Sequence, residues 1–386
     1  MPSAELLRVA IAGSGPSACF TVEALLATGR AVEVDVLERL HMPFGLARFG
    51  IAPDHPETRR IAETFARHLS APPVRLFTGV ELGRTVDLEA LRANYDAVVL
   101  ATGAAEDAGI AIPGTGLAGV YGAAAFVGWY TGHPDFIGLD PLLDQPGLAV
   151  IGNGNVALDI ARLLARTSAE LEGTEIAPAT REAIAGAGIR DIYLIGRRGP
   201  LEAKFTNPEL RELAGLADAG IVAEPASIPA AAPPGTGRMQ VRNLEAFRAY
   251  ASAPPRSATR RIHFLFDATP EEIVGSGRVT GLRLCVGRGE KRERLVACGA
   301  VVTATGFLPA RLSGLPFDGD GRLLHKAGRV AEGLYAVGWL KRGPSGVLGT
   351  SKPDGFLAAQ SILEEVAATP GRRGRKWLEA HLGRTA

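Results

Sequence analysis

Two glycine-rich segments constrain this chain more than any other feature. The first, residues 9–18, reads VAIAGSGPSA, and the second, residues 148–157, reads LAVIGNGNVA. In each, an apolar run typical of a buried strand leads into a Gly-x-Gly turn and then into a helix-forming segment. The glycines let the backbone turn tightly and approach a pyrophosphate, which then lies at the helix N-terminus. Each segment therefore predicts a βαβ unit of the dinucleotide-binding type.

The strand after each turn ends in a different kind of charge. The alternating segment at residues 32–38 ends in Glu38, whereas the strand at residues 191–196 leads to Arg197 and Arg198. A carboxylate there accepts hydrogen bonds from ribose hydroxyls and repels a 2′-phosphate, while paired guanidinium groups attract one. The pattern predicts FAD at the first turn and NADP at the second. Simpler explanations, a solvated carboxylate and a solvated basic turn, stay open.

Composition and charge exclude several other classes of protein. A chain of 386 residues is long for one core and predicts two domains. The net charge of +1 gives no general attraction to nucleic acid, and no apolar run approaches the ~20 residues of a membrane span. The three cysteines, Cys19, Cys285 and Cys298, are too far apart for a disulfide scaffold or a metal site. With no signal-like segment near Met1, we expect a cytoplasmic protein without a metal.

A repeated tripeptide motif predicts how the two dinucleotide-binding units are joined. Ala-Thr-Gly follows an apolar run at residues 101–103 and again at residues 304–306, and the two phrases bracket the second glycine turn. The simplest topology therefore inserts one domain into the other. We predict an α/β fold of two Rossmann-like domains. The FAD-binding domain would comprise residues 1–106 and 305–386, with an NADP-binding domain at 107–304 inserted into it.

The final part of the chain carries weaker signals. Residues 333–338 form a short apolar run that we expect to complete the sheet of the first domain. After Gly371 the sequence turns basic, and we expect that segment to fray or to pack lightly.

Two further segments carry candidate functional residues. His55 lies in the loop Pro-Asp-His-Pro; such a histidine is most often merely exposed, but in a segment that lines a ring-shaped ligand it can handle a proton. In the segment FTNPELREL, Asn207 is expected to cap a helix that carries Glu209 and Glu212 on one face. Charge compensation in the first turn would explain both acids without a functional role.

Several blocks resemble adrenodoxin reductase and its bacterial ferredoxin–NADP reductase relatives. They occur in matching order from Val9 to about Gln360, at residues 43–56, 126–130, 152–162, 196–201 and 338–350. The block GWLKRGP is the most specific, because broader two-dinucleotide flavoproteins usually carry an aspartate directly after that glycine. The segment Lys352-Pro353-Asp354 departs from the pattern of the family.

The resemblance implies a function and a set of site residues. Hydride would pass from NADPH to FAD, and electrons would then pass one at a time to a ferredoxin-type iron–sulfur protein. The residues that would hold FAD are Gly13, Gly15, Ser17, Glu38, Leu46, Leu82, Trp339, Gly346, Val347 and Leu348. The residues that would hold NADP are Asn153, Gly154, Asn155, Val156, Arg197, Arg198, Glu209 and Gly346. His55 and Glu212 match a pair near the flavin that influences proton supply, and they are the candidate catalytic residues.

Other function classes also bind two dinucleotides. A flavin disulfide reductase needs a reactive cysteine pair, which this sequence lacks. An NADPH-dependent flavin monooxygenase, the flavin subunit of a larger oxidoreductase complex and a non-catalytic dinucleotide-responsive protein stay open. Arg256, Arg260 and Arg261 form a basic cluster that would suit an acidic ferredoxin, although a solvated face explains them equally well.

Overall fold

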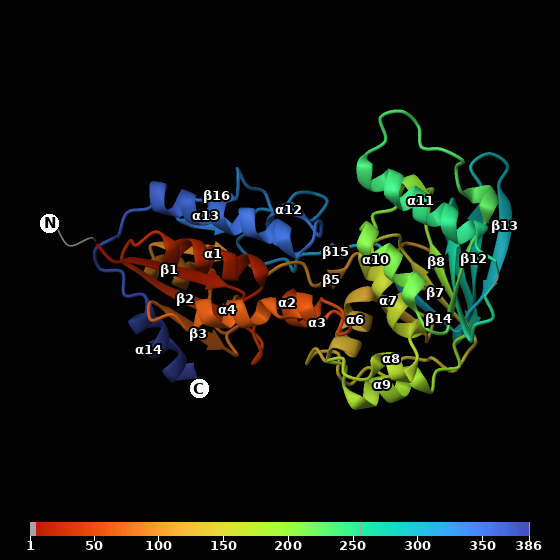
Figure 1. The fold of residues 1–386 in the computed structure, drawn as a ribbon. Helices are drawn as coiled ribbons and strands as arrows, with labels where there is room; N and C mark the ends of the chain where they lie inside the picture. Colours follow the sequence, from red (N-terminus) through yellow and green to blue (C-terminus); the bar gives the residue numbers. More distant parts are fainter. Residues whose placement is uncertain (1–4, 255, 386) are drawn as a thin grey trace. The chain divides into compact units, whose positions relative to one another are not determined.

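The chain folds into two compact units, seen here in a computed structural model that describes residues 5–254 and 256–385 (Figure 1). Unit 1 comprises the described residues up to Ile51, then His55–Glu106 and the chain from Phe307 onward. Unit 2 comprises Ala52–Asp54 and Asp107–Gly306. The three-residue excursion into unit 2 at Ala52–Asp54 is a feature that no sequence pattern indicated.

Unit 1 is built on a six-stranded sheet in the order β16-β17-β4-β1-β2-β3. Its strands are β1 (Leu7–Ala12), β2 (Val32–Glu38), β3 (Val74–Thr78), β4 (Ala97–Leu100), β16 (Arg329–Ala331) and β17 (Leu334–Ala336). All neighbours are parallel except β16 and β17. The apolar run at residues 333–338 forms β17, which pairs with β4 as expected.

Alternate residues of the central strand β1 face two separate cores. Val9 and Ile11 contribute to one core, and Ala10 and Ala12 to the other. The helices of the first core are α1 (Pro16–Ala27), α4 (Ile61–Leu69) and α13 (Ser351–Glu365). Those of the second are α5 (Leu88–Asn94) and α14 (Arg375–Thr385). The remaining helices of unit 1 are short: α2 (Leu46–Phe49), α3 (Pro56–Arg59), α12 (Trp339–Arg342) and the 3₁₀ turn η4 (Leu348–Thr350).

Unit 2 repeats this plan around a six-stranded parallel sheet in the order β6-β14-β7-β8-β10-β9. Its strands are β6 (Val120–Gly122), β7 (Gly147–Ile151), β8 (Asp191–Ile195), β9 (Ala219–Ala223), β10 (Arg260–Leu265) and β14 (Ala300–Thr303). The antiparallel strands β11 (Ala268–Ser276), β12 (Arg278–Val286) and β13 (Arg292–Ala297) share a core with the sheet. Short strands β5 (Glu106–Asp107) and β15 (Phe307–Leu308) pair separately.

The helices of unit 2 connect the parallel strands. They are α6 (Ala123–Thr131), α7 (Asn155–Ala165), α8 (Ser168–Leu171), α9 (Pro178–Ala185), α10 (Asn207–Glu212) and α11 (Arg238–Ser252), with 3₁₀ turns η1 (Pro200–Glu202), η2 (Leu213–Gly215) and η3 (Pro225–Ser227). Parallel strands alternating with helices in both units confirm the predicted α/β class with two Rossmann-like units.

The same backbone contact organises both glycine turns. A Cβ atom on Gly13, whose φ is +101°, would lie 2.4 Å from the carbonyl oxygen of Ala101. A Cβ atom on Gly152 would lie 2.4 Å from the carbonyl oxygen of Ala304. These alanines open the two repeated Ala-Thr-Gly phrases. Each glycine turn therefore packs against the loop formed by one Ala-Thr-Gly tripeptide, and only glycine fits at the point of contact.

The basic segment after Gly371 does not fray, contrary to expectation, because a buried ion pair anchors it. It forms α14, whose Leu378 side chain is fully buried in the second core. Arg375 Nε donates to Asp35 Oδ1 at 2.6 Å, and Tyr95 Oη donates to Asp35 Oδ2 at 2.7 Å. Burial raises the pKa of Asp35, while hydrogen bonds from Tyr95 and Arg375 oppose that rise.

Replacing Arg375 by leucine should lower the free energy of unfolding by about 3 kcal/mol at pH 7, because the buried Asp35 carboxylate loses its cation. The pKa of Asp35 is already raised in the folded state, so its ionised form opposes folding as pH rises. The deficit should therefore shrink at pH 4. Urea unfolding followed by circular dichroism measures both, with exposed Arg384→Leu on the same helix as control. Equal losses in the two variants would contradict the assignment.

Candidate functional site

In unit 1, the carboxylate at the end of β2 is part of the glycine turn rather than a solvated strand end. Glu38 Oε2 accepts from the Ser14 hydroxyl at 2.5 Å and from the Ser14 amide at 3.1 Å, and Oε1 accepts from the Leu40 amide at 2.9 Å. Ser14 Oγ in turn accepts from the Phe44 amide at 3.0 Å. Both Ser14 and Glu38 are buried. The simple alternative for Glu38, an exposed carboxylate, is wrong.

Glycines bring two other segments against this turn. A Cβ atom on Gly45, directly before Leu46, would lie 3.1 Å from the Cα of Gly15. A Cβ atom on Gly338, directly before Trp339, would lie 2.5 Å from Ser17 Oγ. The backbone thus approaches the N-terminus of α1 from two sides, which leaves a cradle of main chain around the turn.

The segment that contains Trp339 is held by a carboxylate from α13. Asp354 is buried and accepts from the Gly338 amide at 2.5 Å, from Lys341 Nζ at 2.5 Å and from an Arg342 nitrogen at 2.9 Å. Arg342 also donates to Thr350 Oγ1 at 3.1 Å, beside the turn that contains Gly346. The Lys-Arg pair of the GWLKRGP block is therefore internal to the fold.

The remaining residues predicted to hold FAD lie in different surroundings within unit 1. The Trp339 ring stacks on Phe307 with centroids 5.7 Å apart. Leu46 and Val347 are exposed by 41% and 51%, which is unusual for aliphatic side chains and leaves them open to a ligand. Leu82 belongs to the second hydrophobic core. Leu348 packs at the margin of the first core.

In unit 2, the second glycine turn is tied to the segment before α10. Asn153 O accepts from the Lys204 amide at 2.8 Å, and Asn155 Oδ1 accepts from the Thr206 amide at 2.9 Å. Val156 follows in the first turn of α7, for which Gly154 is the N-cap. Lacking a side chain, Gly196 makes room for Asn153, because a Cβ there would lie 1.7 Å from Asn153 Nδ2.

Two buried oxygens beside this turn have no hydrogen-bond partner within the described part of the chain. They are Asn153 Oδ1 and Glu209 Oε2. A buried polar atom without a partner costs free energy, so such atoms mark places where a ligand completes the structure. Glu209 lies in the first turn of α10, whose N-cap residue is Thr206 rather than the predicted Asn207, without a capping hydrogen bond from its side chain. Asn207 instead donates to Asn243 Oδ1 at 3.1 Å.

The paired arginines lie at the end of β8 with their side chains exposed. No side-chain hydrogen bond or ion pair is found for Arg197 or Arg198 among the residues that the structure describes. The neighbouring Gly199 and Pro200 are buried and fix the corner. Two such guanidinium groups at the carboxyl end of a parallel strand can bind an anion bidentately.

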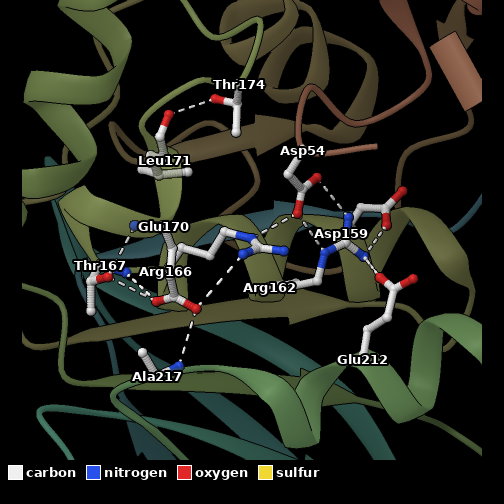
Figure 2. A network of polar contacts seen from close by, with 10 residues as sticks. All are labelled: Asp54, Asp159, Arg162, Arg166, Thr167, Glu170, Leu171, Thr174, Glu212 and Ala217. Atoms are coloured by element: carbon white, nitrogen blue, oxygen red, sulfur yellow. Dashed lines mark hydrogen bonds and ion pairs between the residues drawn. The ribbon is translucent and has the colours of Figure 1, made fainter. Parts of the chain in front are cut away.

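His55 and Glu212 lie in separate units. His55 is the N-cap residue of α3 in unit 1 and is half-buried. Glu212 ends α10 in unit 2, where its Oε2 lies 3.6 Å from the buried guanidinium of Arg162. Figure 2 shows Glu212 at one end of a network of polar contacts that also includes Asp54, the residue before His55.

Comparison with known proteins identifies relatives over nearly the whole chain. The NADPH-ferredoxin reductase FprA of Mycobacterium tuberculosis is 38% identical over 408 residues, which cover 98% of this chain and 88% of that protein. The mitochondrial NADPH:adrenodoxin oxidoreductase of Bos taurus is 35% identical, covering 94% of this chain and 79% of that protein. The chain belongs to the adrenodoxin reductase family. The resemblance found in the sequence is thereby confirmed.

Solved structures agree with this family membership. Mycobacterium tuberculosis FprA in complex with NADPH superposes with a TM-score of 0.91 at 35% identity, covering 98% of this chain and 90% of that one. Thioredoxin reductase of T. acidophilum has a TM-score of 0.56 at 17% identity, covering 93% of this chain and 98% of that one, and shares the fold alone. The chain matches no model of a protein family. Within the described residues, no helix is long and apolar enough to cross a membrane.

The basic cluster of Arg256, Arg260 and Arg261 makes contacts within unit 2, and its meeting with a ferredoxin stays a prediction, because Arg256 and Arg261 are exposed. Arg256 donates to the carbonyl oxygens of Leu216 and Ala217, and Arg260 donates to Leu164 O and Ile184 O. Arg261 forms a bidentate pair with Asp191. The three guanidinium groups therefore satisfy acceptors of unit 2 itself.

Sequence reasoning missed Ser14 and Asp354, which hold Glu38 and the segment before Trp339 in place. Ser14 is the variable residue of the Gly-x-Gly turn, so the motif gave it no weight. Asp354 lies in the segment that departs from the family pattern. A signal for it was available, because a buried turn that carries Lys341 and Arg342 needs a nearby carboxylate.

Replacing Glu209 by glutamine should have opposite effects on folding and on ligand binding. The apo-protein should become more stable by about 1 kcal/mol, because a neutral amide costs less than a carboxylate at a site where one oxygen is buried without a partner in the described part of the chain. Affinity for NADP+ should fall, because the charged acceptor is lost. Thermal unfolding and isothermal titration calorimetry measure the two effects. Exposed Glu202→Gln is the control, and a variant that loses both stability and affinity would count against the interpretation.

Proposed function

We propose that this chain transfers hydride from NADPH to FAD and passes the electrons singly to a ferredoxin-type iron–sulfur protein. The observation that carries the proposal is a difference in charge between two similar glycine turns. Buried Glu38 is hydrogen-bonded to the first turn, whereas the strand after the second turn leads to exposed Arg197 and Arg198. The names NADPH-ferredoxin reductase and NADPH:adrenodoxin oxidoreductase, carried by relatives, support it. When bound, the flavin supplies the conversion of a two-electron donor into one-electron steps.

Unit 1 fits a flavin dinucleotide, and we assign FAD to it. The glycine cradle gives main-chain amides at the N-terminus of α1 for a pyrophosphate. Glu38 is already buried and oriented by Ser14, so its remaining lone pairs can accept from ribose hydroxyls. Ser17, Leu46, Leu82, Trp339 and residues 346–348 complete the proposed site.

Unit 2 fits NADP by the same reasoning with the opposite charge. Gly154 opens α7, whose N-terminal amides suit the pyrophosphate, together with residues 153–156. Arg197 and Arg198 bind the 2′-phosphate, which distinguishes NADPH from NADH. The buried Asn153 Oδ1 and Glu209 Oε2 are acceptors that nucleotide donors would satisfy.

His55 and Glu212 have a different role in this proposal, because hydride transfer itself requires no general base. An imidazole and a carboxylate are both side chains that can carry a proton. We therefore assign them to proton supply at the flavin rather than to nucleophilic chemistry. We also propose a cytoplasmic location, which the three free cysteines support.

The reductase proposal is tested by rapid mixing of the FAD-loaded protein with NADPH or NADH. NADPH should bleach the flavin absorbance faster than NADH, and added ferredoxin should then support cytochrome c reduction. A flavin monooxygenase would instead consume NADPH and oxygen with an organic substrate and without ferredoxin. A flavin band that NADPH leaves unchanged would contradict the proposed function.

Replacing Arg197 and Arg198 by alanine should weaken NADPH binding by about 2–4 kcal/mol, because two charge-assisted contacts to the 2′-phosphate are lost. NADH, which lacks that phosphate, should bind almost as before. Equilibrium titration of both nucleotides measures the difference. The exposed Arg190, which precedes the same strand, gives the matched control Arg190→Ala. Equal losses for both nucleotides would show that the pair does not bind the phosphate.

A further inference from the structure

A buried arginine in unit 2 has no role in the function proposed above. Arg162 lies on α7, the helix that begins at the second glycine turn, and its side chain has an exposed fraction of 0%. Its guanidinium donates to both oxygens of Asp54, from Nε at 2.8 Å and from Nη2 at 2.9 Å. Nη1 donates to Asp159 Oδ1 at 2.8 Å and lies 3.6 Å from Glu212 Oε2 (Figure 2).

A second arginine extends the network along the same side of unit 2. Arg166 Nε donates to Asp54 Oδ2 at 2.8 Å, and its Nη1 lies 3.7 Å from Glu170 Oε1. Glu170 is fixed in turn by a capping box with Thr167 and by the amide of Ala217. These contacts hold Asp54 from two sides, so its carboxylate has little freedom to move.

The charge of Arg162 is maintained despite its burial. Burial lowers the pKa of the guanidinium, but the hydrogen bonds to Asp54 and the charges of Asp159 and Glu212 raise it above the usual value. A bidentate arginine–carboxylate pair is strongly directional. In the interior, such a pair contributes to a defined geometry more than to net stability.

The contacts of Arg162 involve both candidate catalytic residues. It contacts Glu212 directly, and it contacts Asp54, the residue before His55. Asp54 ends the excursion Ala52–Asp54, which packs with unit 2, and His55 follows it directly. Pro53 O also accepts from the Glu175 amide at 3.4 Å, which adds a backbone contact within unit 2. The main chain that leads into His55 is therefore fixed to α7.

We propose that Arg162 is a positioning residue for the proton supply that accompanies flavin reduction, acting on His55 through Asp54 and on Glu212 directly. This inference rests on the proposed function. Arg162 is separated by nearly two helical turns from Asn155, the first residue of α7, so it does not form part of the nucleotide-binding turn. Its loss should therefore reduce the rate of flavin reduction more than the affinity for NADPH.

The kinetic test compares three variants of the FAD-loaded protein. Arg162→Lys keeps the charge but loses the planar fork, and Asp54→Asn keeps the shape but loses the charge. Arg261→Lys is the matched control, because Arg261 also holds an aspartate with two bonds, of 2.8 and 3.0 Å to Asp191, yet is half exposed. The limiting rate of flavin reduction should fall about 10- to 100-fold in the first two variants, with an apparent Kd for NADPH changed by less than about threefold.

A second readout does not depend on turnover. Hydrogen–deuterium exchange in the absence of NADPH should show faster exchange of the amides of residues 52–59 in Arg162→Lys and Asp54→Asn. The same amides should exchange at the wild-type rate in Arg261→Lys. This measurement remains valid for a variant with reduced thermal stability, provided that it is folded at the temperature used.

The outcomes separate this inference from the proposed function. A wild-type protein that NADPH does not reduce would contradict the function, while the exchange data would still test the anchoring of residues 52–59. Wild-type rates and unchanged exchange in both Asp54 and Arg162 variants would overturn the inference. A rate loss that only follows lost FAD, or that Arg261→Lys shares, would also overturn it, because it would indicate general destabilisation.

Discussion

Two backbone carbonyl groups set the conditions under which both units form. The oxygens of Ala101 and Ala304 lie so close to Gly13 and Gly152 that any side chain would collide with them. This approach brings the end of one parallel strand against the turn that follows its neighbour. The amides at the start of α1 and α7 are thereby left facing outward from the edge of each sheet. The availability of these amides to a ligand depends on this contact.

The features that the sequence predicts correctly are those set by neighbouring residues. The alternation that makes β2, the apolar run of β17 and the α/β class of both units depend on local pattern and on glycine. The family follows from short blocks that occur in matching order along this chain, and the relatives confirm it. The positions of Glu38 and Arg197 at the ends of strands could be predicted for the same reason, because each strand follows a glycine turn in the sequence.

The features that escaped prediction are polar pairs between distant residues. Asp54 and Arg162 are 108 positions apart, and Asp35 and Arg375 are 340 apart. Each carboxylate looks like an ordinary surface residue in its own segment, and only the fold shows that it is buried with a cation. The segment after Gly371 is an example. Its basic composition predicted fraying, but the ion pair between Arg375 and Asp35 and the buried side chain of Leu378 anchor α14.

The short excursion at Ala52–Asp54 bears on how such a protein can evolve. An inserted domain is usually portable, because it enters and leaves its host through two connections. Here a contiguous piece, residues 107–306, would carry the buried Arg162 away without Asp54, its bidentate partner. Recombination at these two boundaries would thus leave Arg162 buried without its bidentate partner. An exchangeable form of this unit must therefore include residues 52–54 as well as residues 107–306.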